Sequence, residues 1–550
     1  MQENTENNND PYTAFRNSKK KSGNAFTPFL YATVLAFGVM LGYVINTATT
    51  SKQSLFNQRY DKVEDILNYI SLKYVDTVNK ADLTDKTIDK MLSNLDPHSV
   101  YIPAQDLSEV NESLEGNFQG IGIEFFIVQD TITVVTAIPG GPSELVGIKA
   151  GDRIIKINDT IVAGVKVKDT DVKKKLRGPK DTQVKVGVLR SGKKDLIDFD
   201  ITRNTIPLYS VDAAYMINST VGYIKINNFS STTHQEFVEK LSELKDKGMQ
   251  ELVIDLRGNP GGYLQAATAM ADELISGEKL LVYTEGKAYP RQDYNARRPG
   301  MFEQGKISVL IDQGSASASE ILAGAIQDWD RGVIVGRTSF GKGLVQEQYD
   351  LRDGSALRLT VARYYTPSGR SIQRPYDKGN EDYYNQVYER YMRGEFVHED
   401  TIASKDTTIY KTKNGRRVYG GGGIRPDVFV PVDTSADNEY FYTVRSYVPE
   451  FVYKYSSQHP GIQDSYKTKE EFRKGFVITD AMLNEFYSYA IGAGLKRSEA
   501  KDAKIKEKLK LNIEAFIAKQ TWRLDGYYYI MNETDNVVNI AVAKMKEGIK

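Results

Sequence analysis

The stretch Gly314-Ser-Ala-Ser-Ala-Ser-Glu320 decides the fold of the central part of this 550-residue chain. It follows an apolar run at 307–311, typical of a buried strand, and precedes apolar residues at helical spacing between Ile321 and Trp329. The sequence therefore predicts a strand-to-helix turn with Ser317 at its centre. The first N–H groups of a helix have no partner within the helix, so a hydroxyl beside them suits a nucleophile. A serine-rich helix cap is the alternative that this turn leaves open.

A candidate base follows in the chain. Lys342 lies 25 residues after Ser317, in Gly341-Lys-Gly343. A serine hydroxyl needs a base, and none of the four histidines lies near the serine cluster in sequence. Lysine can act as the base when burial among apolar groups lowers its pKa and keeps it neutral. If this segment is a strand, Gln346 lies on the same face and can hold the amine by a hydrogen bond. The alternative is a solvated surface lysine.

A glycine-rich loop follows a second predicted buried strand, at 251–256. The loop is Arg257-Gly-Asn-Pro-Gly-Gly262, and a helical pattern comes after it. Glycines at a strand-to-helix turn allow close backbone approach and can aim N–H groups at a developing oxyanion. Many α/β turns carry glycines, so this loop is informative only beside the other two segments.

The three segments together resemble the carboxyl-terminal processing peptidases, which are tail-specific serine proteases with a PDZ domain. The matching motifs are Asp255-Leu-Arg-Gly-Asn-Pro-Gly-Gly262, Gly314–Glu320 and Phe340-Gly-Lys-Gly-Leu-Val-Gln346, with further matches at 366–373 and 423–428. The resemblance covers roughly residues 55 to 430. It implies an α/β multidomain fold, in which a crotonase/Clp-peptidase-like core of ββα units carries an inserted PDZ-like β-domain.

The resemblance also implies the roles of the site residues. Ser317 is the nucleophile, Lys342 is the general base, and Gln346 orients the lysine amine. Ser315 and Ser319 are weaker candidates, because the family's pattern places the reactive serine in the middle of the three. We expect no cofactor and no metal, since the chain has no cysteine and its four histidines do not cluster.

An oxyanion hole is a further implication of the resemblance. One donor is the Ala318 N–H, and the other is an N–H group of the glycine-rich loop, from Gly261 or Gly262. The sequence does not choose between these two glycines. Converging N–H groups of this kind stabilise the tetrahedral intermediate of acyl transfer.

The N-terminus carries a candidate membrane anchor. Residues 1–24 are polar and asparagine-rich, and we expect a disordered cytoplasmic segment there. Residues 25–51 carry no charge, and a transmembrane anchor is predicted at 25–48. The basic residues before it, Arg16 and 19–21, favour a cytoplasmic N-terminus and a catalytic part outside the cytoplasm, in the periplasm or an equivalent space at the cell (inner) membrane. A cleaved signal peptide is the alternative.

Residues 54–112 are predicted to be helical, and 113–204 form a β-rich module that resembles a PDZ domain, closed by a strand at 184–189. Its loop Gly120-Ile121-Gly122-Ile123 would offer backbone N–H groups to a terminal carboxylate, while the peptide adds as a strand to the neighbouring sheet edge. A hydrophobic pocket beside the loop would take an apolar last residue. The expected partners are proteins with exposed apolar C-terminal tails. A β-domain without a ligand is the alternative.

The peptidase core is predicted at 205–433, with a charged, tyrosine-rich insertion at 374–419 that departs from the family's pattern. The insertion could be a lid, a docking surface or a tolerated loop excursion. Residues 434–550 are predicted to be largely helical, and could cover the core, form a homo-oligomer contact or bind an adaptor. The 72 basic and 72 acidic residues give no reason to expect nucleic-acid binding.

These observations favour a membrane-anchored serine endopeptidase that processes or degrades proteins through their C-terminal tails. Two alternatives stay open. One is a catalytically silent scaffold whose PDZ domain binds protein C-termini, against which the intact Ser317, Lys342 and Gln346 argue. The other is an α/β hydrolase of small acyl substrates, which the lack of a Gly-x-Ser-x-Gly motif at Ser317 disfavours.

Overall fold

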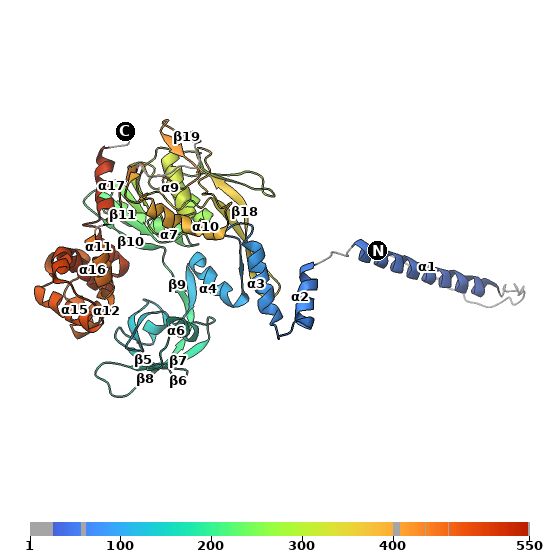
Figure 1. The fold of residues 1–550 in the computed structure, drawn as a ribbon, viewed down its shortest axis with the longest axis horizontal. Helices are drawn as coiled ribbons and strands as arrows, with labels where there is room; N and C mark the ends of the chain where they lie inside the picture. Colours follow the sequence, from blue (N-terminus) through green and yellow to red (C-terminus); the bar gives the residue numbers. More distant parts are fainter. Residues whose placement is uncertain (1–25, 57–61, 400–407, 435, 460, 548–550) are drawn as a thin grey trace, which may run out of the picture. The chain divides into compact units, whose positions relative to one another are not determined.

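The computed structural model describes residues 26–56, 62–399, 408–434, 436–459 and 461–547 (Figure 1). The chain divides into two compact units, residues 1–84 and 85–550. The disordered segment predicted for residues 1–24 lies outside the described residues.

The described residues of the first unit are mainly helical. This unit contains α1 (Phe26–Phe56), α2 (Lys62–Lys73) and the start of α3 (Lys80–Leu92). Among the residues that the structure describes, no helix is both long enough and apolar enough to cross a membrane. The anchor predicted for 25–48 therefore finds no support here; Ala25 and the side chains of 44–48 lie outside the described residues.

The second unit contains a β-rich module that begins and ends on two paired strands, β2 (Asn117–Gly120) and β9 (Asn204–Pro207). Between them, an antiparallel sheet has the order β3-β4-β5-β7-β8, with β6 beside β5. Its strands are β3 (Ile123–Val128), β4 (Thr131–Ala137), β5 (Arg153–Ile157), β6 (Thr160–Ile161), β7 (Gln183–Leu189) and β8 (Ile197–Thr202). The module also contains α5 (Pro142–Leu145) and α6 (Asp169–Leu176), and β3 is an edge strand of the sheet.

The closing strand of this module differs from the prediction. The predicted strand at 184–189 is β7, but β8 follows it and pairs with it antiparallel. Residues 197–201 alternate apolar and acidic side chains, which is a strand pattern with one face in solvent. Strand β8 was not predicted, because the charged turn at 190–196 precedes this short pattern.

The peptidase core is built on a six-stranded sheet of order β10-β11-β12-β15-β16-β21, in which only β10 and β11 are antiparallel neighbours. The strands are β10 (Val211–Met216), β11 (Val221–Ile226), β12 (Glu251–Asp255), β15 (Lys306–Ile311), β16 (Val333–Gly336) and β21 (Val428–Phe429). Both faces are buried: Leu252 and Ile254 join one apolar cluster, and Val253 joins another on the opposite face. Continuous apolar strands are expected for a parallel sheet covered on both sides.

Helices cover both faces of this sheet (Figure 1). α7 (Thr233–Asp246), α8 (Leu264–Asp272) and α9 (Ala318–Asp328) pack on one face, and α17 (Asn536–Glu547) packs on the other. A second sheet adjoins this layer, with the order β1-β18-β13-β14 and β17 also paired with β18. Its strands are β1 (Val100–Ile102), β13 (Leu280–Glu285), β14 (Gln292–Asn295), β17 (Leu344–Asp350) and β18 (Ala356–Tyr365).

The predicted insertion contains α10 (Asn380–Met392) and a hairpin of β19 (Ile409–Lys411) and β20 (Arg417–Tyr419). The C-terminal region is helical in its described part, and its α17 covers the core sheet. Its other helices are α11 (Ala436–Arg445), α12 (Val448–Gln458), α13 (Gly461–Asp464), α14 (Lys469–Gly475), α15 (Asp480–Gly492) and the kinked α16 (Glu499–Met531). The remaining helix, α4 (Ala104–Glu115), precedes the β-rich module.

Candidate active site

The three serines of the predicted nucleophile turn differ in their surroundings. Ser317 stands at the start of α9 and keeps partial solvent access. Ser315 and Ser319 are fully buried, and their hydroxyls donate to the Leu256 carbonyl (2.8 Å) and the Asn259 carbonyl (3.0 Å). Of the three, only Ser317 can therefore meet a substrate.

The backbone of Ser317 is strained. Its φ of 53° lies in the left-handed region, which costs a non-glycine residue free energy unless the surroundings hold it. Two buried side chains supply such support. The Ser317 N–H donates to Glu320 Oε2 (2.8 Å), and the Tyr364 hydroxyl donates to the Ser317 carbonyl (3.1 Å).

Glu320 ties the nucleophile turn to the lysine segment. Its Oε2 also accepts the Lys342 N–H (2.9 Å), while its Oε1 accepts the Gly341 N–H (2.7 Å) and the Ser339 hydroxyl (2.5 Å). Full burial raises the pKa of Glu320 to about 7, although these hydrogen bonds oppose the rise. This role of Glu320 was not predicted from the sequence, where a glutamate three residues after the helix start was the available signal.

Lys342 and Gln346 meet as predicted for a base and its orienting group. The Lys342 Nζ donates to Gln346 Oε1 over 3.2 Å. Burial lowers the pKa of Lys342, and the positive charge of Arg358 lowers it further, against the opposing charges of Glu320 and Asp96. A lowered pKa increases the fraction of neutral amine, which is the form that can accept a proton.

The prediction that Lys342 and Gln346 lie on one face of a regular strand is wrong. Lys342 precedes β17 rather than lying in it, and the β17–β18 register shifts between Val345 and Gln346. A bulge of this kind re-aims side chains, so the simple alternation of faces does not hold across it. The Tyr364 hydroxyl, which donates to the Lys342 carbonyl (2.8 Å), fixes the backbone of the lysine instead.

Gln346 is held from a distant part of the chain. Its Nε2 donates to the carbonyl of His98. Asp96 shapes the turn around His98, because its Oδ1 accepts the N–H groups of His98 (2.8 Å) and Ser99 (2.9 Å). Burial, together with the charges of Lys342 and Arg374, lowers the pKa of the His98 imidazole to about 3, so the ring is neutral and does not compete as a base at ordinary pH.

The glycine-rich loop lies against the nucleophile turn. A Cβ on Gly261, whose φ is 98°, would stand 2.8 Å from the Ala318 nitrogen and from Ser317 Cβ. Gly262 instead backs onto Phe229, where a Cβ would stand 2.0 Å from the carbonyl oxygen. Side chains are therefore excluded at both glycines, but only Gly261 has its α-carbon directly against the serine.

The N–H groups of the two glycines differ in a way that bears on the oxyanion hole. The Gly261 N–H donates to Asn259 Oδ1 over 2.8 Å. Within the described residues, neither the Gly262 N–H nor the Ala318 N–H donates a hydrogen bond to the protein. Asn259 also accepts the Ala316 N–H on its carbonyl (2.9 Å), which joins this loop to the nucleophile turn.

The loop is anchored at its start by charged groups. The buried Asp255 forms an ion pair with the partly buried Arg257, whose Nη2 lies 2.6 Å from Asp255 Oδ2. Arg257 also pairs with Asp535, just before α17 (2.8 Å). Lys225 joins the same network through Asp255 (3.4 Å). We therefore interpret these residues as structural support for the glycine-rich loop and not as groups that contact the substrate.

The predicted carboxylate loop lies between β2 and β3 in the β-rich module. The carbonyls of Ile121 and Gly122 accept the N–H groups of Ser143 (3.0 Å) and Ile138 (3.0 Å). In the described part of the chain, the N–H groups of Ile121 and Gly122 donate to no other protein group. The adjoining β3 is one of the two edge strands of the sheet, and in the described part of the chain it pairs only with β4. The loop and edge thus have the backbone groups that a bound C-terminus requires.

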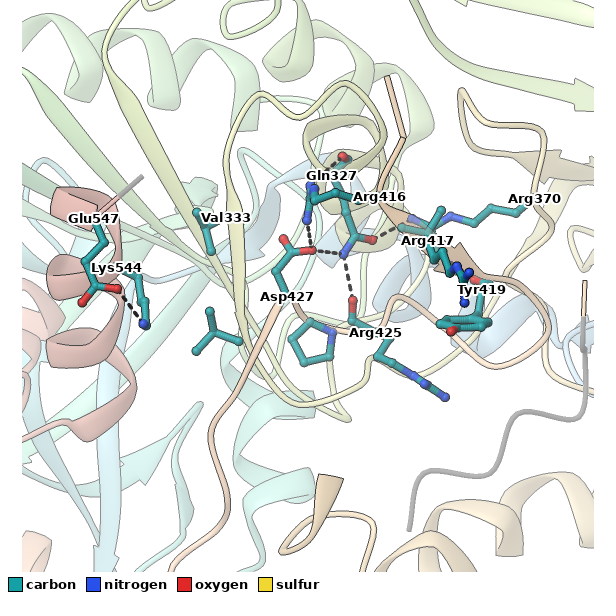
Figure 2. Close-up of a pocket in the computed structure, with 13 residues that line it drawn as sticks. Gln327, Val333, Arg370, Arg416, Arg417, Tyr419, Arg425, Asp427, Lys544 and Glu547 are labelled. Carbon is teal, nitrogen blue, oxygen red and sulfur yellow. Dashed lines mark hydrogen bonds and ion pairs between the residues drawn. The ribbon is translucent and has the colours of Figure 1, made fainter. Parts of the chain in front are cut away.

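A separate cavity of about 410 Å³ opens at the far end of α9 (Figure 2). Gln327, residues 416–419, residues 425–428 and α17 line it, and none of the predicted catalytic residues does. Most of its charges are paired, as between Arg416 and Asp427. The described residues also include no group of three or more metal-ligating side chains.

The comparisons with known proteins identify the family. The model of peptidase family S41 matches residues 220–379, that of a PDZ domain matches 133–190, and that of the activating protease CtpB N-terminal domain matches 42–106. The chain is 36% identical over 345 residues to the carboxy-terminal processing protease CtpB of Bacillus subtilis, across 60% of this chain and 68% of that protein. The chain belongs to the carboxy-terminal processing proteases.

Two further relatives belong to the same family. This chain is 33% identical over 349 residues to the carboxy-terminal-processing protease of Bartonella bacilliformis, across 63% of this chain and 79% of that protein. It is 32% identical over 358 residues to CtpA of Bacillus subtilis, across 64% and 76%. A family of unknown function matches residues 440–523.

The processing protease is thus a serine-type peptidase with an S41 core and a PDZ domain, and it binds protein substrates through their C-termini. The predicted family, enzyme class and α/β fold with a PDZ domain are confirmed. Because the family consists of serine-type peptidases, the two alternatives, a catalytically silent scaffold and a hydrolase of small acyl substrates, are not favoured.

Proposed function

We propose that Ser317, Lys342 and Gln346 are the catalytic group of this protease. The observation that carries the proposal is the buried Lys342 amine, bonded to Gln346, in a segment that Glu320 and Tyr364 join to Ser317. Burial and a nearby arginine keep the pKa of the amine low, which a general base requires.

The reaction then proceeds in two acyl-transfer steps. The neutral Lys342 amine takes the Ser317 proton while Oγ attacks the scissile carbonyl carbon, and a tetrahedral oxyanion forms. The Lys342 ammonium returns that proton to the leaving amine as the C–N bond breaks, which leaves an acyl ester on Ser317. The neutral Lys342 amine then takes a proton from a water molecule whose oxygen attacks the ester carbon. As the ester C–O bond breaks, the Lys342 ammonium returns the proton to Ser317 Oγ, and a new C-terminal carboxyl group is released.

The oxyanion hole is assigned here to the Ala318 and Gly262 N–H groups. Both lack a protein acceptor among the described residues, whereas the Gly261 N–H is already bonded to Asn259. Gly261 would instead provide the open space beside Ser317 that a substrate carbonyl needs. Each such donor contributes about 3 kcal/mol to the stability of the transition state.

Substrate tails are proposed to bind along β3, with the terminal carboxylate on the loop Gly120–Ile123. The free N–H groups of Ile121 and Gly122 and the unpaired edge of β3 support this position. An apolar last residue is expected, because the module's core beside this loop consists of branched aliphatic side chains.

Cleavage of an unstructured protein with an apolar C-terminus tests the assignment. The full chain should cleave it, and Ser317→Ala and Lys342→Ala should lose cleavage by more than about a thousandfold, with tail-peptide binding and thermal stability retained. Ser315→Ala, which removes a hydroxyl bonded to the backbone, is the control for folding effects. Full cleavage by Lys342→Ala would contradict the proposed base.

The location of the enzyme is proposed from the sequence alone. The uncharged stretch at 25–51 and the basic residues before it favour an extracytoplasmic catalytic part attached to the cell (inner) membrane. Fractionation of cells that express the full chain, with protease accessibility from outside, checks this. A homo-oligomer or an adaptor bound through the C-terminal region is likewise a proposal, and sedimentation of the purified chain tests it.

A further inference from the structure

We propose that α10, within the insertion, belongs to the catalytic machinery, because Tyr383 and Tyr384 position the turn that holds Gln346 and thereby Lys342. The inference rests on the proposed catalytic group. It makes the two tyrosines positioning residues, since neither contacts the reacting atoms.

The connection from α10 to the base runs through one turn of the chain, residues 96–99. Gln346 accepts the Lys342 amine on Oε1 and donates from Nε2 to the His98 carbonyl. On the α10 side, the Tyr384 hydroxyl donates to the Pro97 carbonyl over 2.7 Å. The Tyr383 hydroxyl lies 3.0 Å from His98 Nε2, and the two rings meet edge to face.

The two peptide planes of this turn are each held at both ends. Asp96 accepts the N–H group of the Pro97–His98 peptide, and Tyr384 binds the carbonyl of the same peptide. Asp96 also accepts the N–H group of the His98–Ser99 peptide, whose carbonyl accepts from Gln346. If the Tyr384 bond is lost, the first plane can rotate, and the His98 carbonyl no longer has a fixed direction toward Gln346.

Tyr383 is itself rigidly packed. It is fully buried, its ring meets that of Phe340 edge to face, and the Arg374 guanidinium carbon lies 3.9 Å from the centroid of each ring. Phe340 lies two residues before Lys342. Tyr383 thus touches both the turn that holds Gln346 and the segment that leads into the lysine.

This helix lies outside the part of the chain that the S41 family model matches. The match ends at residue 379, and α10 begins at Asn380. From the sequence, three roles stayed open for this insertion: a lid, a docking surface or a tolerated loop excursion. The contacts favour another role, in which the insertion supports the base.

The test removes single hydroxyl groups and leaves the rings in place. Tyr384→Phe in the full chain should lower kcat for an unstructured protein substrate about three- to tenfold, with KM unchanged, as expected for the loss of one positioning hydrogen bond. Tyr383→Phe should act in the same direction. Tyr388→Phe is the matched control, because Tyr388 lies one turn further along α10 with 65% of its surface exposed, and it should leave kcat unchanged.

A double-mutant cycle separates positioning from a merely structural role. In the Gln346→Ala background, Tyr384→Phe should change kcat by less than about twofold, because the group through which it acts is gone. If Tyr384→Phe lowers kcat equally in the wild-type and Gln346→Ala backgrounds, or does not lower it in the wild-type background, the inference is overturned. Lys342→Ala serves as the separate test of the underlying mechanism: if it retains activity, the proposed base fails, whatever the tyrosine variants do.

Discussion

The two sides of the active site are built in different ways. The nucleophile side, residues 255–262 and 314–320, consists of two turns that follow neighbouring parallel strands, β12 and β15. The base side, Lys342 and Gln346 with the turn 96–99, depends on contacts between segments more than two hundred residues apart. The first arrangement follows from local strand-to-helix geometry. The second exists only in the folded chain, and we expect it to be the more easily adjusted.

The largest expected effect comes from closing the space on the nucleophile side. Gly261→Ala places a Cβ 2.8 Å from Ser317 Cβ and the Ala318 nitrogen, so cleavage should fall about a hundred- to a thousandfold. Gly258→Ala is the control in the same loop, since it carries a comparable backbone strain at a φ of 69° but its Cβ meets nothing within 4 Å. Steady-state cleavage assays on both variants, with thermal unfolding, test this. Equal losses in the two variants would show that the loop's conformation, and not the space beside Ser317, is decisive.

Glu320 joins the two sides, and its replacement should have the next largest effect. In Glu320→Gln, an amide NH₂ group replaces one of two oxygens that each accept two donors, so at least one backbone N–H group faces another donor. We expect kcat to fall about ten- to a hundredfold. Glu285→Gln, on an exposed part of β13, is the control. If Glu320→Gln keeps the kcat of the wild type, catalysis does not depend on the hydrogen bonds by which Glu320 joins the two sides.

The base side should respond to charge without losing its structure. Arg358 lowers the pKa of Lys342, so Arg358→Gln should raise that pKa and leave less neutral amine at a given pH. The acid limb of the profile of kcat/KM against pH should therefore move to higher pH. Arg363→Gln, exposed on the same strand, should not move the limb. If the acid limb of kcat/KM does not move in Arg358→Gln, Arg358 does not lower the pKa of Lys342.

The smallest effect is expected at the outer anchor of the nucleophile side. Asp535→Asn weakens one of the two pairs of Arg257, but Asp255 remains and asparagine still caps α17 well. The loss of kcat should be less than about threefold. Steady-state kinetics measure the loss of kcat in Asp535→Asn, and urea unfolding of the same variant measures its stability. A loss above tenfold without a change in stability would show that the C-terminal region controls the loop more strongly than this comparison allows.

Sequence reasoning succeeded where the signal was local. The strands before Gly258 and Gly314 are mostly apolar, and the turns that follow them carry the small residues that a close approach requires. The pairing of Lys342 with Gln346 was also expected, although from a strand alternation that the bulge at Val345 and Gln346 breaks.

The rest of the site could not be predicted from the sequence, because its contacts are long-range or involve main-chain groups. The His98 carbonyl that holds Gln346 belongs to no side-chain motif. Tyr384 and Tyr364 are two of 35 tyrosines, and nothing in the sequence separates them from the others. The difference between Gly261 and Gly262 depends on which N–H the Asn259 amide oxygen accepts, which only the folded loop reveals.

The central claim is that Lys342 is neutral when it meets Ser317, and its titration tests this most directly. Competitive labelling of lysine amines with a trace amine-reactive reagent across a pH series, read out by mass spectrometry of the peptide that carries Lys342, gives the pKa of that one group. The account predicts a pKa clearly below the ordinary value of about 10.4 for lysine, and a matching acid limb in kcat/KM. A Lys342 amine that titrates at the ordinary value, in an enzyme whose activity rises at lower pH, would contradict it.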